Sequence, residues 1–161
     1  MSFDEAFEYT MDFEGGEKVT NDPSDPGGLT KWGVSQRSFP GLNIRDLTED
    51  QAKAIYKTHY WDSMSLDNLP QRVAIKLFDM GVNIGVRKSA RLAQEAFNDY
   101  CGVPALTVDG SVGPKTISAL FGADEDSYLF MLVHHLSEYY RGLNNPKYIR
   151  GWLRRAETLP K

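Results

Sequence analysis

Apolar residues recur along most of this chain at the three- and four-residue spacing of α-helices. Near the N-terminus they lie four residues apart, at Phe3, Phe7 and Met11. Glu14 follows three residues later, so its carboxylate continues the apolar face of a first helix. The Gly15-Gly16 pair ends that helix, because glycine adopts the left-handed cap conformation at little steric cost. The pattern therefore predicts a glutamate that faces the interior or a cleft from the end of a helix.

The same periodicity predicts further helices, and little of the chain has the alternation of a β-strand. The expected helices cover 48–61, 70–85, 87–100, 115–121, 127–140 and a segment after Pro146. Thr48 and Gln51 have the spacing of a capping box at the start of the first of these. A short hairpin between Val19 and Val34 is the one strand-like stretch that we expect. The fold class is therefore mainly α, with a small β-hairpin or irregular loop after the first helix.

Length and composition favour a folded protein that forms one unit. The chain has 161 residues, of which 41% are hydrophobic and 25% charged. No segment approaches the roughly 20 apolar residues that a membrane helix requires, and no Ser/Pro/Gly-rich linker separates two domains. The acidic start of the chain lacks the basic and apolar regions of a secretory signal. We therefore expect synthesis in the cytoplasm and no membrane insertion, with two small lobes around a cleft as one arrangement that fits this length.

The titratable residues argue against several kinds of chemistry. Cys101 is the only cysteine, so an intrachain disulfide is impossible, and a single cysteine is more often a small hydrophobe than a nucleophile. The three histidines lack the spacing of a zinc site, so we expect no metal and no cofactor. The net charge of −4 disfavours a nucleic-acid partner. Residues 141–161 are basic, however, and this end either meets an anionic polymer or is a solvated surface.

Glu14 is the residue best suited to catalysis. An apolar helix face and a helix C-terminus both disfavour a carboxylate anion, so both favour the protonated acid. A carboxylic acid that keeps its proton near neutral pH is what a glycosidase needs as its general acid. The loop that follows carries Asp22, Asp25 and Thr30 among prolines and glycines that stiffen it. An ordinary helix end and ordinary turns are the structural alternative for the same residues.

The run from Glu14 to Ser35 resembles the signature of the glycoside hydrolase family 108 muramidases, lysozyme-like enzymes that include phage endolysins. The matching elements are E-G-G at 14–16, N-D-P-S-D-P-G-G at 21–28 and T-K-W-G-V-S at 30–35. Further motifs, including D-G-S-V-G-P-K-T at 109–116 and G-W-L-R-R at 151–155, resemble the helical peptidoglycan-binding region that accompanies these domains. The resemblance implies a lysozyme-like fold, with a catalytic region over 1–86 and a wall-binding region over 87–161 packed as one unit. We expect D-G-S-V-G-P-K-T itself to be structural.

The resemblance also implies the reaction, which is hydrolysis of the β-1,4 bond between N-acetylmuramic acid and N-acetylglucosamine in peptidoglycan. Glu14 would donate the proton to the bridging oxygen. Asp25 is the first choice for the second carboxylate, because it precedes Thr30 by five residues in the manner of phage-type lysozymes. Asp22 is either the alternative carboxylate or an Asx-turn cap. Thr30 would position the attacking water or bond the carboxylate.

Substrate contacts are expected from Asn83, Tyr60 and Trp61. Asn83 lies in F-D-M-G-V-N-I-G at 78–85, which resembles the family's F-D-x-x-V-N-x-G, and its amide suits an N-acetyl group. Tyr60 and Trp61 belong to a Y-W-D element and either stack on a sugar or pack in the core. Asp79 either serves the site or is the buried partner of an arginine.

Other functions remain open at this point. A lytic transglycosylase would use a lone acid and yield 1,6-anhydro products. A binding module would hold peptidoglycan without cutting it, although the intact Glu14, Asp25 and Thr30 argue against this. A muramidase of this kind either lyses a phage host or remodels the wall for secretion. For the phage role, the resemblance implies a monomer that acts on glycan strands in the periplasm after release through a holin.

Overall fold

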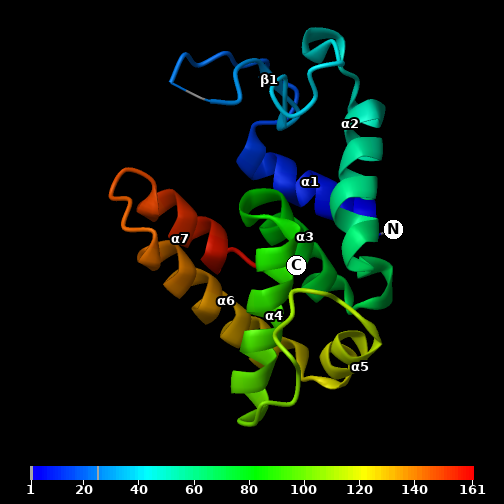
Figure 1. Ribbon diagram of the computed structural model, residues 1–161, viewed down its shortest axis with the longest axis vertical. Helices are drawn as coiled ribbons and strands as arrows, with labels where there is room; N and C mark the ends of the chain where they lie inside the picture. The colour runs from blue at the N-terminus through cyan, green and yellow to red at the C-terminus, as the bar shows by residue number, and fades with distance from the viewer. Residues whose placement is uncertain (1, 25) are drawn as a thin grey trace.

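The structure, a computed structural model, describes residues 2–24 and 26–161 and is mainly α, as the periodicity predicts (Figure 1). The helices are α1 (Ser2–Glu14), α2 (Glu49–Tyr56), α3 (Gln71–Ile84), α4 (Val86–Cys101), α5 (Pro114–Gly122), α6 (Glu125–Gly142) and α7 (Ile149–Glu157). Strands β1 (Thr30–Lys31) and β2 (Val34–Ser35) form a two-stranded antiparallel sheet. Short helical turns lie at Ile44–Asp46, Lys57–Trp61, Asp62–Met64 and Leu66–Asn68.

Helix α1 ends where the sequence predicts. Phe7 and Met11 are buried, and α1 packs along α3. Gly15 and Gly16 have φ angles of +90° and +56°, the left-handed region that favours glycine. Glu14 is therefore the last residue of α1, at the point where the chain turns away into the β region.

The expected hairpin after the first helix is present as β1 and β2. The turn between them depends on Gly33, whose φ is +71° and whose missing side chain leaves room for the Tyr56 hydroxyl. That hydroxyl donates to the Trp32 carbonyl at 2.9 Å, which ties the hairpin to α2. A Cβ built on Gly33 would also lie 3.5 Å from the Cβ of Glu14. The hairpin turn therefore packs directly on the end of α1.

Helix α2 begins as predicted but is shorter than predicted. Thr48 and Gln51 form the capping box, with Gln51 N donating to Thr48 Oγ1 at 3.2 Å and Thr48 N donating to Gln51 Oε1 at 3.0 Å. The α-helix ends at Tyr56, and Lys57–Trp61 continue as a π-helical turn. Apolar spacing over one turn does not distinguish an α-turn from a π-turn, so the sequence did not reveal this change.

Helix α3 is the centre of the molecule. Its residues 73–81 are all buried, and it contacts α1, α4 and α6. Helix α4 packs on α6, and α6 packs on α7. The hydrophobic core runs without interruption from Ala6 in α1 to Ala156 in α7. The N-terminal and C-terminal halves of the chain therefore share one core.

The D-G-S-V-G-P-K-T element forms the turn into α5 around the buried Gln94. The side-chain oxygen of Gln94 accepts from the backbone N–H groups of Asp109 at 3.1 Å and Gly110 at 2.9 Å. Its amide nitrogen donates to Asp109 Oδ1 at 2.8 Å. These contacts lie within the protein, so the element has the structural role that the sequence analysis expects.

Candidate active site

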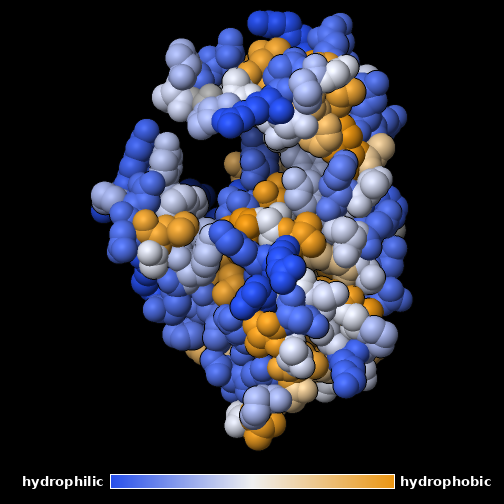
Figure 2. Space-filling view, viewed as in Figure 1, coloured by the Kyte–Doolittle hydropathy of each residue, from blue (hydrophilic) through white to orange (hydrophobic). Residues whose placement is uncertain are grey.

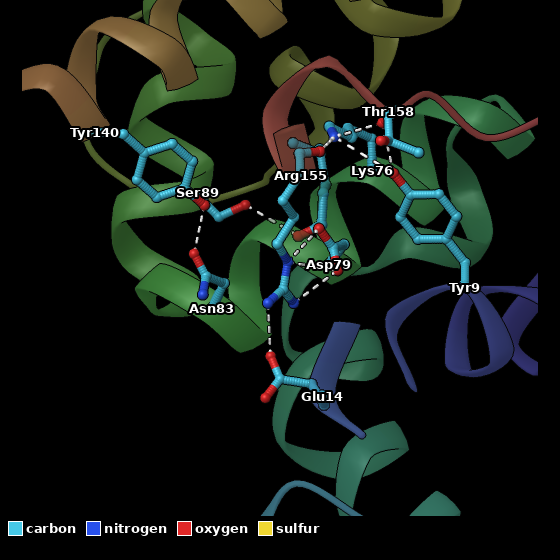
Figure 3. Close-up of polar contacts among 10 residues, drawn as sticks. Tyr9, Glu14, Lys76, Asp79, Asn83, Ser89, Tyr140, Arg155 and Thr158 are labelled. Carbon is cyan, nitrogen blue, oxygen red and sulfur yellow. Dashed lines mark hydrogen bonds and ion pairs between the residues drawn. The ribbon is translucent and has the colours of Figure 1, made fainter. Parts of the chain in front are cut away.

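Glu14 meets a cation from the far end of the chain. Arg155 on α7 donates from Nη1 to Glu14 Oε1 at 2.8 Å (Figure 3). The Glu14 side chain is 26% exposed and the Arg155 side chain 9% exposed. The contact joins the end of α1 to α7. The protein at rest therefore pairs the candidate acid with a positive charge that the sequence analysis did not include.

Arg155 is itself held by Asp79 on α3. Arg155 Nε lies 3.2 Å and 3.1 Å from the two carboxylate oxygens of Asp79, and Nη2 lies 2.8 Å from Oδ1 (Figure 3). The guanidinium carbon also lies 5.0 Å from the centre of the Phe13 ring. Burial alone would lower the pKa of Arg155, but the hydrogen bonds and charges of Asp79 and Glu14 raise it. Asp79 is thus the buried partner of an arginine, one of its two expected roles.

Lys76, three residues before Asp79 on α3, is a second buried cation. Its Nζ donates to the backbone carbonyls of Arg155 and Thr158, each at 2.8 Å, and lies 3.4 Å from the Tyr9 hydroxyl. Tyr9 in turn donates to the Thr158 carbonyl at 2.6 Å. Burial lowers the pKa of Lys76 from 10.5 to about 8, although the Asp79 carboxylate opposes this shift. These bonds fasten the end of α7, and with it Arg155, to α1 and α3.

A pocket of about 540 Å³ opens beside the Arg155 side chain. Figure 2 shows that the molecule is hollowed between the β region and the end formed by α6 and α7. Asn83, at the end of α3, lies in the pocket wall, and its side-chain oxygen accepts a hydrogen bond from Tyr140. Within residues 2–24 and 26–161 the Asn83 amide nitrogen donates no hydrogen bond, so it is available to a ligand. The lining residues are Asp12, Phe13, Asn83, Gly151, Trp152, Arg154, Arg155 and Thr158.

The loop residues after α1 occupy different environments. Thr30, in β1, is partly buried, and its hydroxyl donates to the Gly28 carbonyl at 3.2 Å. Asp22 is exposed and accepts from Ser24 N at 2.8 Å and from Ser24 Oγ at 2.7 Å. These two hydrogen bonds lower the pKa of Asp22. Asp22 therefore forms the Asx-turn that we gave as its alternative role. Asp25 lies outside the described residues, and its role stays a prediction.

Trp61 does not provide a sugar-stacking surface, which corrects one of its two expected roles. Its side chain is fully buried and packs edge-on against Phe3 and Phe78 at centroid distances of 5.7 Å and 5.9 Å. A ring without exposed surface cannot stack on a substrate, so Trp61 is a core residue. Tyr60 is only partly buried, and burial followed by the charge of Glu14 raises its pKa. Tyr60 therefore lies within the electrostatic reach of the candidate acid.

Arg155 and Lys76 are the site residues that the sequence analysis missed. The available signal for Arg155 was the basic character of residues 141–161. That signal does not distinguish the buried Arg155 from its exposed neighbours Arg150 and Arg154. Lys76 gave no signal, because a lysine within an apolar helix usually lies on a solvated face.

Two family models match the chain, one after the other. The Glycosyl hydrolase 108 model matches residues 7–85, and the Predicted Peptidoglycan domain model matches residues 88–157. Among solved structures, SagA of Brucella abortus is similar, with a TM-score of 0.78 and 26% sequence identity. The similarity covers 96% of this chain and 88% of that chain. No match to a curated protein was found.

The fold, the site and these matches together define a glycoside hydrolase that acts on peptidoglycan. The chain belongs to the glycosyl hydrolase 108 family over its first half and carries a predicted peptidoglycan domain over its second. The resemblance inferred from the motifs is thereby confirmed.

In the part of the chain that the structure describes, no helix is long and apolar enough to cross a membrane. The same residues contain no group of His, Cys, Asp and Glu side chains suited to a metal ion.

Proposed function

We propose that this protein is an N-acetylmuramidase that hydrolyses the β-1,4 bond between N-acetylmuramic acid and N-acetylglucosamine. Glu14 is the general acid. The observation that carries this proposal is the position of Glu14. It is the last residue of α1, its side chain is partly exposed, and its carboxylate pairs with Arg155, which lines the pocket. A glycosidase needs its acid at such a place, within reach of the bridging oxygen of a bound glycan.

Arg155 and Asp79 are placed to assist the transfer of a proton from Glu14 to the substrate. When Glu14 gives its proton to the bridging oxygen, a carboxylate forms 2.8 Å from the guanidinium, which stabilises the new charge. Before that step, while Glu14 holds the proton, Asp79 still neutralises Arg155 through three contacts of 3.2 Å or less. Protonation of Glu14 therefore does not leave an unpaired buried guanidinium, which would be costly.

The opposite face of the sugar needs a second group. We propose Asp25 for this role, with Thr30 positioning the attacking water. The support is the resemblance of the loop sequence and the place of Thr30 in the hairpin that packs on Glu14. Asp22 is the alternative, although its carboxylate is engaged by Ser24. On the substrate side, the Asn83 amide suits an N-acetyl group.

The test of this proposal is the chemistry of the products. Purified peptidoglycan is digested with the protein, and the soluble fragments are analysed by mass spectrometry. A muramidase releases fragments with reducing-end muramic acid. Fragments with 1,6-anhydro muramic acid would instead identify a lytic transglycosylase, in which a hydroxyl of the substrate replaces water.

The matched variant is Glu14→Gln, which keeps the shape of the side chain and removes its proton. We expect turnover to fall by at least about a hundredfold, the scale of general acid catalysis, while the thermal unfolding midpoint stays close to that of the parent. A well-folded Glu14→Gln variant with substantial activity would remove Glu14 from the mechanism.

We further propose that the enzyme serves as a phage endolysin that reaches the periplasm through a holin. The support is the resemblance of its motifs to muramidases of that kind. Purified protein should lyse Gram-negative cells only after their outer membrane has been permeabilised. Rapid lysis of untreated cells would contradict this. A gene neighbourhood with secretion genes in place of a holin would favour wall remodelling for export.

A further inference from the structure

Helix α7 contributes an aromatic side chain to the pocket beside Arg155, the partner of Glu14. Trp152 lines the pocket and stacks on Tyr140 of α6, with ring centres 5.4 Å apart and planes inclined by 18°. Tyr148 contacts the same indole at 5.7 Å and is 49% exposed. Because the Tyr140 hydroxyl is bonded to Asn83, the rings are fixed relative to α3. A fixed, partly exposed aromatic group in a pocket wall suits the apolar face of a sugar ring.

Cations lie next to these rings. Arg154 lines the pocket, Arg150 lies one helical turn before it, and Lys147 lies three residues before Arg150. All three are exposed, and none forms an ion pair with any residue in 2–24 or 26–161. Lys147 Nζ lies 5.0 Å from the centre of the Tyr148 ring. Like charges one helical turn apart repel each other, so an anionic ligand would relieve the repulsion between Arg150 and Arg154.

The charge of this part of the pocket differs from that of the whole chain. The whole chain has a net charge of −4, yet the α7 wall is positive. The one carboxylate among the lining residues is Asp12, on the α1 wall. Arg155, the other cation of the pocket, is already neutralised by Asp79 and Glu14. Arg154 is therefore the lining cation that remains for a ligand, and Arg150 is the next exposed cation before it on α7.

We propose that the pocket wall at Trp152 and Arg154, together with Arg150 one helical turn before Arg154, is a subsite for a glycan whose sugars carry carboxylate-bearing peptide substituents. The sugar packs on Trp152, and the substituent carboxylates pair with the arginines. This inference rests on the proposed muramidase function and gives the C-terminal half a direct part in the catalytic cleft. It implies that the enzyme binds peptide-bearing peptidoglycan more tightly than a neutral polymer of N-acetylglucosamine.

The experiment measures binding by the full-length Glu14→Gln protein, which does not cut its ligand. The three probes are purified sacculi, sacculi whose stem peptides have been removed by an amidase, and N-acetylglucosamine tetramer. The charge variant is Arg150→Gln combined with Arg154→Gln. Its matched control is Arg91→Gln combined with Lys115→Gln, which removes two exposed charges from α4 and α5.

We expect the charge variant to lose about fivefold in affinity for intact sacculi, from two ion pairs of the strength seen at exposed sites. Its affinity for the neutral tetramer should stay unchanged. Its loss on the amidase-treated glycan should be smaller than on intact sacculi, because each muramic acid there keeps one lactyl carboxylate in place of the peptide's carboxylates. Its sacculus binding should become less sensitive to salt. The control should match the parent on all three probes. Equal binding of the charge variant and the control to intact sacculi would overturn the role of the arginines.

The aromatic variant is Trp152→Leu, with Phe130→Leu as control, because Phe130 is 75% exposed on α6 away from the pocket lining. Trp152→Leu should weaken binding to all three probes, and Phe130→Leu to none. If Trp152→Leu unfolds, Tyr148→Ala tests the same surface at an exposed position. Unchanged binding in a folded aromatic variant would overturn the sugar contact.

The two proposals can fail separately. If the parent releases reducing-end muramic acid and the arginine and aromatic variants bind normally, the subsite is wrong and the muramidase assignment stands. If the variants lose sacculus binding but the parent yields no such product, the subsite stands and the muramidase assignment is wrong.

Discussion

Arg155 Nη1 lies 2.8 Å from Glu14 Oε1, although the two residues are 141 positions apart along the chain. Glu14 lies in the segment matched by the glycosyl hydrolase 108 model, and Arg155 lies in the segment matched by the predicted peptidoglycan domain. The second half of the chain therefore sets the charge next to the candidate acid. A wall-binding region that served only as an anchor would not need this contact.

Replacing Arg155 by Met should lower stability and activity together. The Asp79 side chain is only 2% exposed, so it would be left as a buried carboxylate without its partner, at a cost of about 3–5 kcal/mol. Glu14 would lose the cation that stabilises its carboxylate, and we expect kcat/KM on peptidoglycan to fall at least about tenfold. Urea unfolding and hydrolysis of labelled sacculi measure the two effects.

A double variant separates these effects. Asp79→Asn combined with Arg155→Met removes both buried charges, so most of the stability should return while activity stays low. Arg155→Lys keeps a charge but lacks the planar fork that contacts two carboxylates, so its loss should be intermediate. Full activity in a folded double variant would exclude Arg155 from catalysis.

The buried Lys76 should make stability increase with pH above about 8. Burial lowers the pKa of Lys76 from 10.5 to about 8, so between these values the unfolded chain binds more protons than the folded one. The free energy of unfolding then rises with pH across this window, by at most about 3 kcal/mol from this group. Urea unfolding between pH 7 and about 9.5 measures the slope.

Lys76→Met is the control, because it removes the titrating group and keeps a long apolar side chain. Its unfolding free energy should lack the rise over the same pH range. Buried tyrosines such as Tyr128 have a raised pKa, so their contribution is lost only as pH rises above about 10, and the measurement stops short of that. Parallel pH dependence in parent and variant would show that Lys76 does not titrate in this window.

Features that depend on neighbouring residues could be predicted from the sequence. Phe7 and Met11 fix the buried face of α1, and Gly15 and Gly16 fix its end, because the spacing and the left-handed conformation are local. The capping box of α2 has the same origin. These elements were sufficient to place Glu14 at the end of a helix and to predict a mainly α fold with a hairpin after it.

Features that depend on distant residues could not be predicted. The arginine partner of Asp79 was anticipated as a possibility, but its identity depends on a contact between residues 76 positions apart. Which arginine of α7 pairs with Asp79 depends on which one is buried. That in turn depends on how α7 packs on α6. Trp61 shows the same difficulty, since an aromatic residue in a helix is suited to both core and cleft until the packing is known.

The two loop aspartates should differ in their effect on activity. Asp22→Asn keeps an oxygen that can accept from Ser24, so the Asx-turn should survive with little loss of activity. Asp25→Asn removes the proposed second carboxylate, and we expect a larger loss than for Asp22→Asn. Steady-state hydrolysis of sacculi by the two variants at equal concentration gives the order. The reverse order would transfer the second role to Asp22.

A fragment that stops after Tyr100 should be insoluble or inactive. It lacks α6, which packs on α3 and α4, and α7, which packs on α6, so part of the shared core would face water. It also lacks Arg155 and Thr158, which leaves Lys76 with none of the carbonyls that it binds. Solubility, cooperative urea unfolding and sacculus hydrolysis of residues 1–100 test this expectation.

The control is co-expression of residues 1–100 with residues 101–161, which retains every side chain and breaks the chain in the last turn of α4, just before the exposed residues 101–105. If the core and the Glu14–Arg155 pair are what the fragment lacks, the two pieces should associate and recover activity. Failure of the pair to associate would show that the connection itself is needed. A soluble 1–100 fragment that folds cooperatively and hydrolyses sacculi alone would show that the second half is a detachable anchor, because neither Arg155 nor the α7 wall would then be required.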